Sequence, residues 1–271
     1  MWKVGITSSF PINDENLSAM RASGVEAMEL NLAGGKPCDH KEVAELAKKH
    51  DILLWSCHLP FVPRDAMNFA IPDAALHKAA RALHTELIQK GTEIGIDKFV
   101  IHPSTPIPEG LDREECKKYS MESLDYLAEV AHRYGAVLAV EDMILSCLGN
   151  SADELMEIIS VNDKLRVCFD TNHLFNDTQV EFARKLGNKI ITMHVNDYDF
   201  IQERHWMPGE GKIDWYAVAD VMQEIGYKGI WLYEFGFSGR IDVRGRELTP
   251  ADYRRNATEI FTKQPLTVIK P

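Results

Sequence analysis

The chain has 271 residues, of which 45% are hydrophobic and 26% charged, the mix of a globular protein with a sizeable core. Its 41 acidic and 30 basic residues give a formal net charge of −11, which disfavours nucleic acid and anionic membrane surfaces as partners, because both attract Lys and Arg. The first residues read as a strand rather than a secretion signal, and no apolar run approaches the ~18 residues of a membrane span. The five cysteines are widely spaced, so we expect a cytoplasmic protein without a disulfide framework.

Eight short runs rich in Val, Ile, Leu and Phe are distributed along the chain. Most of them are almost continuously apolar, which is typical of parallel strands that are buried on both faces. We therefore expect strands at residues 3–8, 26–31, 52–58, 98–102, 137–141, 166–170, 190–194 and 230–234.

Longer segments between the strands carry apolar residues at helical spacing. Ser151 precedes an acidic turn and is a suitable N-cap for one of them, and Gly135 stands where another should end. The spacing predicts helices at residues 74–94, 114–134, 178–186, 214–225 and 250–261, and one that begins after Ser151.

Eight β–α units fill the chain, and no linker, repeat or low-complexity segment divides it. A chain of about this length built from such units is typical of a single (β/α)8 TIM barrel, which we predict as one domain over residues 1–271. A doubly wound sheet of flavodoxin or Rossmann type is the alternative, but it would require two of the strands to be spurious. No strand leads into a glycine-rich turn that binds nucleotide phosphates.

Ionisable side chains stand at the ends of the last six predicted strands, where a TIM barrel builds its active site. A single histidine at such a place is more often a hydrogen-bonded structural residue than a ligand. Several carboxylates around one axis, however, would be costly to bury without a cation. We therefore predict a divalent metal site for Mn²⁺, Co²⁺, Mg²⁺ or Zn²⁺, with Glu141, Asp170, His194 and Glu234 as its ligands.

Further candidate residues lie on the same rim. His58 and His102 end strands, while His173, Glu203 and His205 lie in the loops that follow. These five are candidates for substrate binding or for a second metal site. Aromatic side chains near predicted loops could wall a pocket, namely Phe10, Phe61, Phe237 and Trp206, and Trp206 beside the sequence PGEG is the best lid candidate. Lys212 and Arg240 are candidates for binding a phosphate or carboxylate of the substrate, although a lone basic residue is usually solvated surface.

The order of the motifs HLP, IHP, VED, DTNH, HVND, PGEG and YEF resembles that of the xylose isomerase-like TIM barrel family, which includes sugar phosphate isomerases and epimerases and the AP endonuclease 2 superfamily. The resemblance implies one metal ion held by the four predicted ligands, and a contact of His173 with a substrate oxygen. It implies a sugar, sugar-phosphate or cyclitol isomerase or epimerase in which Glu141 and Glu234 transfer protons through a metal-stabilised enediolate. Its partner would be a small carbohydrate, and a homo-oligomer is left open.

Other functions remain open on the same residues. Endonuclease IV, a zinc phosphodiesterase that acts on abasic DNA, uses additional histidines for further zinc ions, and His58, His102, His173 and the pair Glu203 and His205 stand in matching places. The charge of −11 opposes that function. A dehydratase or lyase acting on a keto-sugar or inosose is a further alternative, as is a catalytically silent barrel that binds metal or sugar. Ketose 3-epimerases place an arginine where this chain has Phe200, so no particular ketose is implied.

Overall fold

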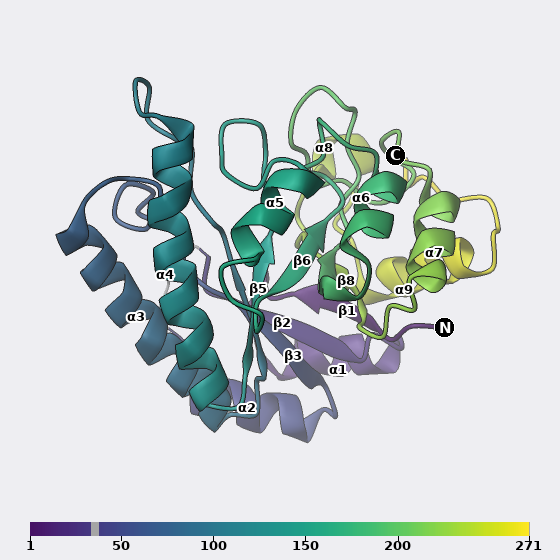
Figure 1. Cartoon of the computed structure of the whole chain (residues 1–271). Helices are drawn as coiled ribbons and strands as arrows, with labels where there is room; N and C mark the ends of the chain where they lie inside the picture. The colour runs from purple at the N-terminus through teal and green to yellow at the C-terminus, as the bar shows by residue number, and fades with distance from the viewer. Residues whose placement is uncertain (34–37, 271) are drawn as a thin grey trace.

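The apolar runs form parallel strands at the centre of the molecule in the computed structural model, which describes residues 1–33 and 38–270 (Figure 1). Within those residues the strands are β1 (Val4–Thr7), β2 (Ala27–Asn31), β3 (Leu53–His58), β4 (Lys98–Ile101), β5 (Val137–Glu141), β6 (Arg166–Asp170), β7 (Ile190–His194) and β8 (Trp231–Tyr233). They make one eight-stranded sheet in the order β7-β6-β5-β4-β3-β2-β1-β8.

The two edges of this sheet meet and nearly close it into a barrel. The bridge joins Val195, just after β7, to Tyr233 in β8, and the Val195 amide donates to the Leu232 carbonyl over 2.7 Å. The seven other pairs of neighbouring strands form parallel ladders. The predicted (β/α)8 TIM barrel is therefore confirmed, and the doubly wound sheet is excluded.

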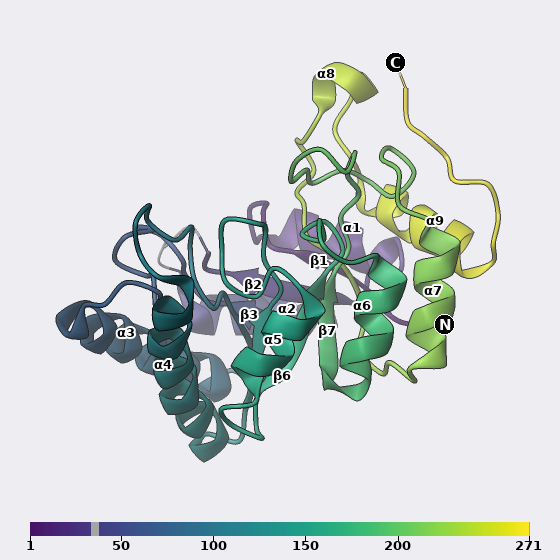
Figure 2. The same ribbon diagram turned by 45° about the horizontal axis from the view of Figure 1, so that its top comes forward.

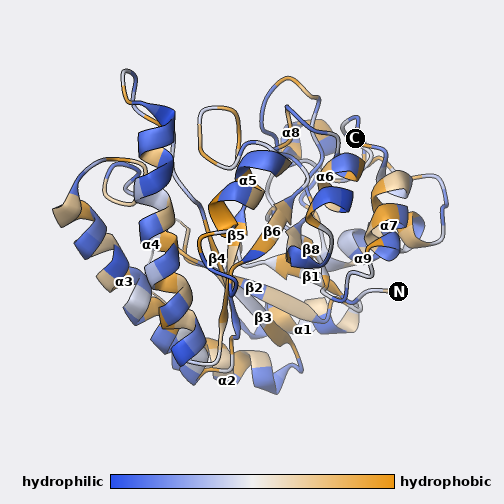
Figure 3. Ribbon diagram, in the orientation of Figure 1, coloured by the Kyte–Doolittle hydropathy of each residue, from blue (hydrophilic) through white to orange (hydrophobic). Residues whose placement is uncertain are grey.

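Helices follow the strands along the chain and surround the barrel. They are α1 (Asp14–Ala22), α2 (His40–Lys49), α3 (Ala74–Glu93), α4 (Arg113–Arg133), α5 (Ala152–Ile159), α6 (Gln179–Leu186), α7 (Trp215–Glu224), α8 (Ile241–Arg244) and α9 (Pro250–Phe261). Figure 3 shows hydrophilic and hydrophobic segments alternating along these helices, around more uniformly hydrophobic strands. Among the described residues, no helix is both long and apolar enough to cross a membrane.

Most helices begin at a residue whose side chain accepts a hydrogen bond from the first turn. Ser151 accepts from the Glu154 amide, and Thr178 and Glu181 form a capping box at the start of α6. Aspartates do the same at α2, α3, α4 and α7. These local signals fix where each helix starts, and hence the length of the loop that precedes it.

The barrel interior changes from apolar to polar along its axis. Val100, Ala139 and Cys168 pack together in one small buried cluster. Two residues further along the same strands come His102, Glu141 and Asp170. Because side chains of a strand alternate between its faces, these three share the inward face one layer above the apolar cluster. Loops and the short α8 rise above this end of the barrel (Figure 2).

Candidate metal and active site

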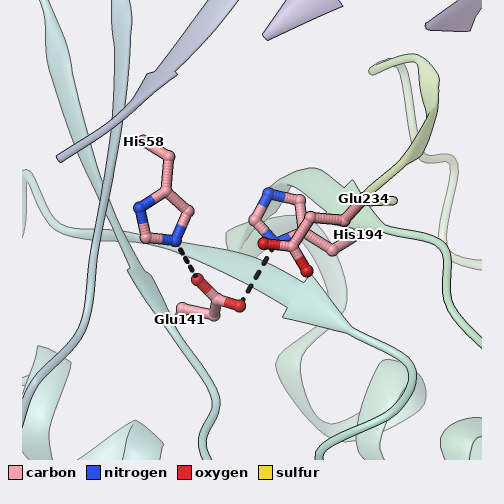
Figure 4. A group of neighbouring side chains, drawn as sticks. All are labelled: His58, Glu141, His194 and Glu234. Carbon is pink, nitrogen blue, oxygen red and sulfur yellow. Dashed lines mark hydrogen bonds and ion pairs between the residues drawn. The ribbon is translucent and has the colours of Figure 1, made fainter. Parts of the chain in front are cut away.

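The predicted ligands converge at the carboxyl end of the barrel. His194 Nδ1 lies 3.1 Å from Glu141 Oε1, 3.4 Å from Glu234 Oε1 and 3.9 Å from Asp170 Oδ2. Glu141, Asp170 and His194 are the last residues of β5, β6 and β7, and Glu234 directly follows β8. In Figure 4, Glu141 lies between His58 and His194, with Glu234 beside His194. Strand register alone therefore brings together four side chains that are far apart in sequence.

Two further histidines contact the other oxygen of Glu141. His58 Nε2 lies 3.1 Å from Glu141 Oε2, and His102 Nε2 lies 3.3 Å from the same atom. The second nitrogen of His58, Nδ1, lies 2.9 Å from the carbonyl oxygen of Leu59, which orients the ring. Glu141 thus stands between His194, which contacts Oε1, and His58 and His102, which contact Oε2.

The candidates from the loops, His173, Glu203 and His205, also contact this cluster. His173 Nε2 lies 3.8 Å from Asp170 Oδ2 and 3.7 Å from Glu203 Oε1. His205 Nε2 lies 3.1 Å from Glu203 Oε1, and its Nδ1 lies 3.7 Å from Glu234 Oε2. All nine residues predicted as ligands or substrate contacts therefore belong to one connected group.

The donor set fits a divalent cation. One ligand atom each from His58, Glu141, His194 and Glu234 all lie within 4.8 Å of one another, and so do those of Glu141, Asp170 and His173. Among the described residues, neither Lys nor Arg forms an ion pair with these carboxylates, and histidines are their ion-pair partners. Buried carboxylates with so little counter-charge favour a bound cation.

The two glutamates differ in their proton affinity. Burial would raise the pKa of Glu141, but the charges of His194 and His102 outweigh it and hold that pKa well below its usual range. Burial raises the pKa of Glu234 to about 7, and repulsion from Asp170 and Glu141 adds to the rise, although His194 opposes it. The two glutamates therefore differ in their surroundings, which favour the ionised form more strongly at Glu141 than at Glu234.

A cavity of about 120 Å³ opens onto these residues. Phe61 and Arg64, from the loop after β3, line it together with Glu141, Glu234 and His205. A substrate group in the cavity would therefore be next to both glutamates. Phe61 is thus one of the predicted aromatic walls, and it stacks on His102 with ring centroids 4.3 Å apart.

The other predicted pocket residues are held elsewhere. Phe10 and Phe237 stack on each other at 4.7 Å, and Trp206 lies outside the lining of this cavity, with the Arg240 guanidinium 4.0 Å from its ring centroid. Arg240 also pairs with Glu210 at 3.2 Å, so it is engaged and not directed at a phosphate. The prediction of Trp206 as a lid therefore stays a prediction.

Asn196 and Glu29 are among the buried residues that touch the ligands but were not predicted. The Asn196 amide nitrogen donates to Asp170 Oδ2 over 3.1 Å and to Glu234 Oε2 over 3.0 Å, which ties these carboxylates together. Glu29, in the middle of β2, lies 3.1 Å from His194 Nε2. The available signals were an amide two residues after His194 and a single acid in the middle of the mainly apolar strand β2.

The chain matches the family model described as "Xylose isomerase-like TIM barrel" over residues 17–255. An uncharacterized protein of Methanocaldococcus jannaschii is 28% identical over 204 residues, which cover 72% of this chain and 68% of that protein. A probable endonuclease 4 of Finegoldia magna is 31% identical over 186 residues, covering 62% of this chain and 64% of that protein. An inosose isomerase of Bacillus subtilis is 27% identical over 145 residues, covering 49% of this chain and about half, 52%, of the relative.

Solved structures of similar fold include a D-tagatose 3-epimerase-like protein, with a TM-score of 0.78 and 22% identity over 96% of this chain and 97% of the other. A D-psicose 3-epimerase of Clostridium cellulolyticum H10 has a TM-score of 0.73 and 20% identity over 86% of this chain and 84% of the other. At these identities the likeness establishes the fold.

Proposed function

Because the chain belongs to the xylose isomerase-like TIM barrel family, we propose that it is a divalent-metal-dependent isomerase or epimerase of a sugar, sugar phosphate or cyclitol. The observation that carries the proposal is the pair of Glu141 and Glu234, which both touch His194 Nδ1 and both line the cavity. Several relatives are named as sugar epimerases or inosose isomerases, which supports this class of reaction.

Glu141 and Glu234 come from β5 and the end of β8, which are three strands apart around the barrel. They can therefore approach a substrate carbon from different sides, one removing a proton and the other returning one. A bound divalent ion, held by Glu141, Asp170, His194 and Glu234, would act as a Lewis acid on substrate oxygens. Proton transfer by a positioned carboxylate typically contributes ~10²–10⁴-fold to the rate.

Exchange of carbon-bound hydrogen with solvent tests this proposal. The metal-loaded protein is incubated in D₂O with a panel of ketoses, aldoses, inososes and their phosphates, and deuterium in the sugars is followed by NMR. We expect incorporation into at least one substrate, and its loss in Glu141→Gln and Glu234→Gln. Glu247→Gln, which removes an exposed carboxylate after β8, should exchange like the wild type. A panel without exchange would count against proton-transfer chemistry and favour a silent binding barrel, whereas loss of water from a keto-sugar would indicate a dehydratase.

An endonuclease IV-like phosphodiesterase is the second candidate. The observation in its favour is that His58 and His102 both contact Glu141 Oε2 while His194 contacts Oε1, so that Glu141 could bridge two metal ions. The relative named as a probable endonuclease 4 supports it. The net charge of −11 opposes tight DNA binding.

Metal stoichiometry and DNA cleavage separate the two candidates. Elemental analysis of the purified protein should give about one metal ion per chain for an isomerase, and roughly three zinc ions for a nuclease-like site. An abasic-site duplex should stay intact under conditions that allow hydrogen exchange. Nicking that a chelator abolishes, together with the higher zinc content, would instead establish the nuclease.

A further inference from the structure

Glu29 is a buried carboxylate that contacts one of the candidate ligands, His194, and is not itself among them. It is fully buried in β2, two residues after Ala27, a member of the small apolar cluster inside the barrel. Its Oε2 accepts a hydrogen bond of 2.7 Å from the Ser56 hydroxyl, and its Oε1 lies 3.5 Å from Thr7 Oγ1 and 3.1 Å from His194 Nε2. Within residues 1–33 and 38–270, His194 is the one Lys, Arg or His side chain in an ion-pair contact with it.

The two nitrogens of His194 face different surroundings. Nε2 points to Glu29, whereas Nδ1 points to the place where oxygens of Glu141, Glu234 and Asp170 gather. An ionised carboxylate can only accept hydrogen bonds, so the nitrogen that faces Glu29 must carry a hydrogen. In a neutral imidazole the other nitrogen then has the free electron pair.

We propose that Glu29 is a positioning residue that holds His194 as the Nε2–H tautomer and so presents Nδ1 as the metal-binding nitrogen. The inference rests on the proposed function, because it requires a metal ion among the four ligands. Ser56 and Thr7 in turn fix the carboxylate, so that strands β1, β2 and β3 orient a ligand that β7 supplies. A carboxylate behind a ligating histidine is a common way to set its tautomer and its basicity.

Metal affinity of a near-isosteric variant tests this role. In Glu29→Gln, the side-chain amide can donate to Nε2 and favour the tautomer that carries its hydrogen on Nδ1. We expect Zn²⁺ and Mn²⁺ to bind about 10–100-fold more weakly, measured by titration calorimetry on chelator-stripped protein. Glu26→Gln, which removes a partly exposed carboxylate just before β2, should bind metal like the wild type. Circular dichroism of both variants reports whether the barrel has formed.

A measurement on the unaltered protein covers the case in which Glu29→Gln does not fold. In zinc-loaded protein with ¹⁵N-labelled histidine, the His194 signals, assigned by their loss in His194→Gln, should show a protonated Nε2 and a metal-bound Nδ1. Metal on Nε2, or equal metal affinity of a folded Glu29→Gln, would overturn the inference and leave the proposed function standing. Wild-type protein that binds none of these metals would overturn both.

Discussion

Glu210 and Arg244 form a buried ion pair between two loops above the barrel. Arg244 Nε lies 2.8 Å from Glu210 Oε1, and Arg244 Nη2 lies 2.8 Å from Glu210 Oε2. Both side chains are almost completely buried. Glu210 belongs to the loop after β7, and Arg244 ends α8. The pair therefore fixes the segment after β8 against the loop that carries Glu203 and His205.

Removing one partner of this pair should be costly, because it leaves a charge buried without compensation. We predict that Glu210→Gln lowers the free energy of unfolding by about 3 kcal/mol, measured by urea denaturation. Glu247→Gln, in the same region but exposed, should change it by less than about 0.5 kcal/mol. A similar small change for both variants would show that the pair contributes little.

Individual site residues were predictable when they stood at strand ends. Glu141, Asp170 and His194 end apolar runs, and the alternation of strand side chains places them on one inward face. Glu29 was missed because it lies inside its strand, where a single acid has no pattern to mark its direction. The contact between Glu29 of β2 and His194 of β7 crosses the barrel interior. It depends on how the closed barrel packs, which cannot be predicted from the sequence of one strand.

The loop after β7 is organised around one buried carboxylate. Asp197 accepts hydrogen bonds from the amides of Gly209 (2.8 Å), Gly211 (3.0 Å) and Ile213 (3.2 Å), and from the indole nitrogen of Trp215 (3.0 Å). A Cβ atom at Gly211 would collide with the Asp197 carboxylate and the Tyr198 carbonyl. The glycine is thus required by the close approach of two backbone segments.

We predict that Gly211→Ala destabilises the protein by about 1–3 kcal/mol, because the added methyl group must displace backbone or break hydrogen bonds to Asp197. Urea denaturation measures the loss. The neighbouring exposed side chain supplies the control, since Lys212→Ala should leave stability nearly unchanged. If Gly211→Ala were as stable as Lys212→Ala, the loop would be more adaptable than its contacts indicate.

The first turn of α9 should make stability depend on pH. Burial would raise the pKa of Asp252, but hydrogen bonds from Arg246 and from Thr249 outweigh it and lower that pKa below its usual range. A carboxyl with a lower pKa in the folded than in the unfolded state stabilises the fold above its unfolded pKa of ~3.9, and loses this effect as the pH falls toward the folded value.

Asp252→Asn should therefore be less stable than the wild type by about 1–2 kcal/mol at neutral pH, and the difference should shrink steadily below pH ~4. Urea denaturation of both proteins over a pH series measures it. Asp242→Asn, at an exposed position of α8, provides a charge-matched control that should show no such trend. A difference that stays constant with pH would mean that shape rather than charge matters at Asp252.

Elements were predicted well where the local pattern was strong. The bounds of β5, β6, β7 and α9 agree with the prediction to the residue, and other strands differ by about one residue at their ends, where pairing with a neighbour decides. No ranges were predicted for α1 and α2, which are short and carry many charges. The four-residue α8 was also missed, because it depends on tertiary contacts such as the pair of Glu210 and Arg244.

At the scale of the whole barrel, metal binding should raise thermal stability. A ligand that binds only the folded state at about 100 times its Kd adds about 2.7 kcal/mol, which for a protein of this size corresponds to roughly 5–10 °C in Tm. We predict such a rise on adding Mn²⁺ or Zn²⁺ to chelator-stripped protein, measured by differential scanning fluorimetry. Asp170→Asn should lose most of it, whereas an unchanged wild-type Tm would argue against a metal site.

The polar layer inside the barrel lies at the ends of the strands, whereas other residues around the cavity belong to the loops, and the two sets can change independently. Glu141, Asp170 and His194 are carried by strands whose preceding inward residues form the sealed lower interior, so their geometry is inherited with the fold itself. Part of the cavity wall comes instead from loops, for example at Phe61 and Arg64. Loop replacement can therefore change the walls of the cavity while the cluster at the strand ends is preserved, which makes the scaffold a convenient starting point for engineered specificity.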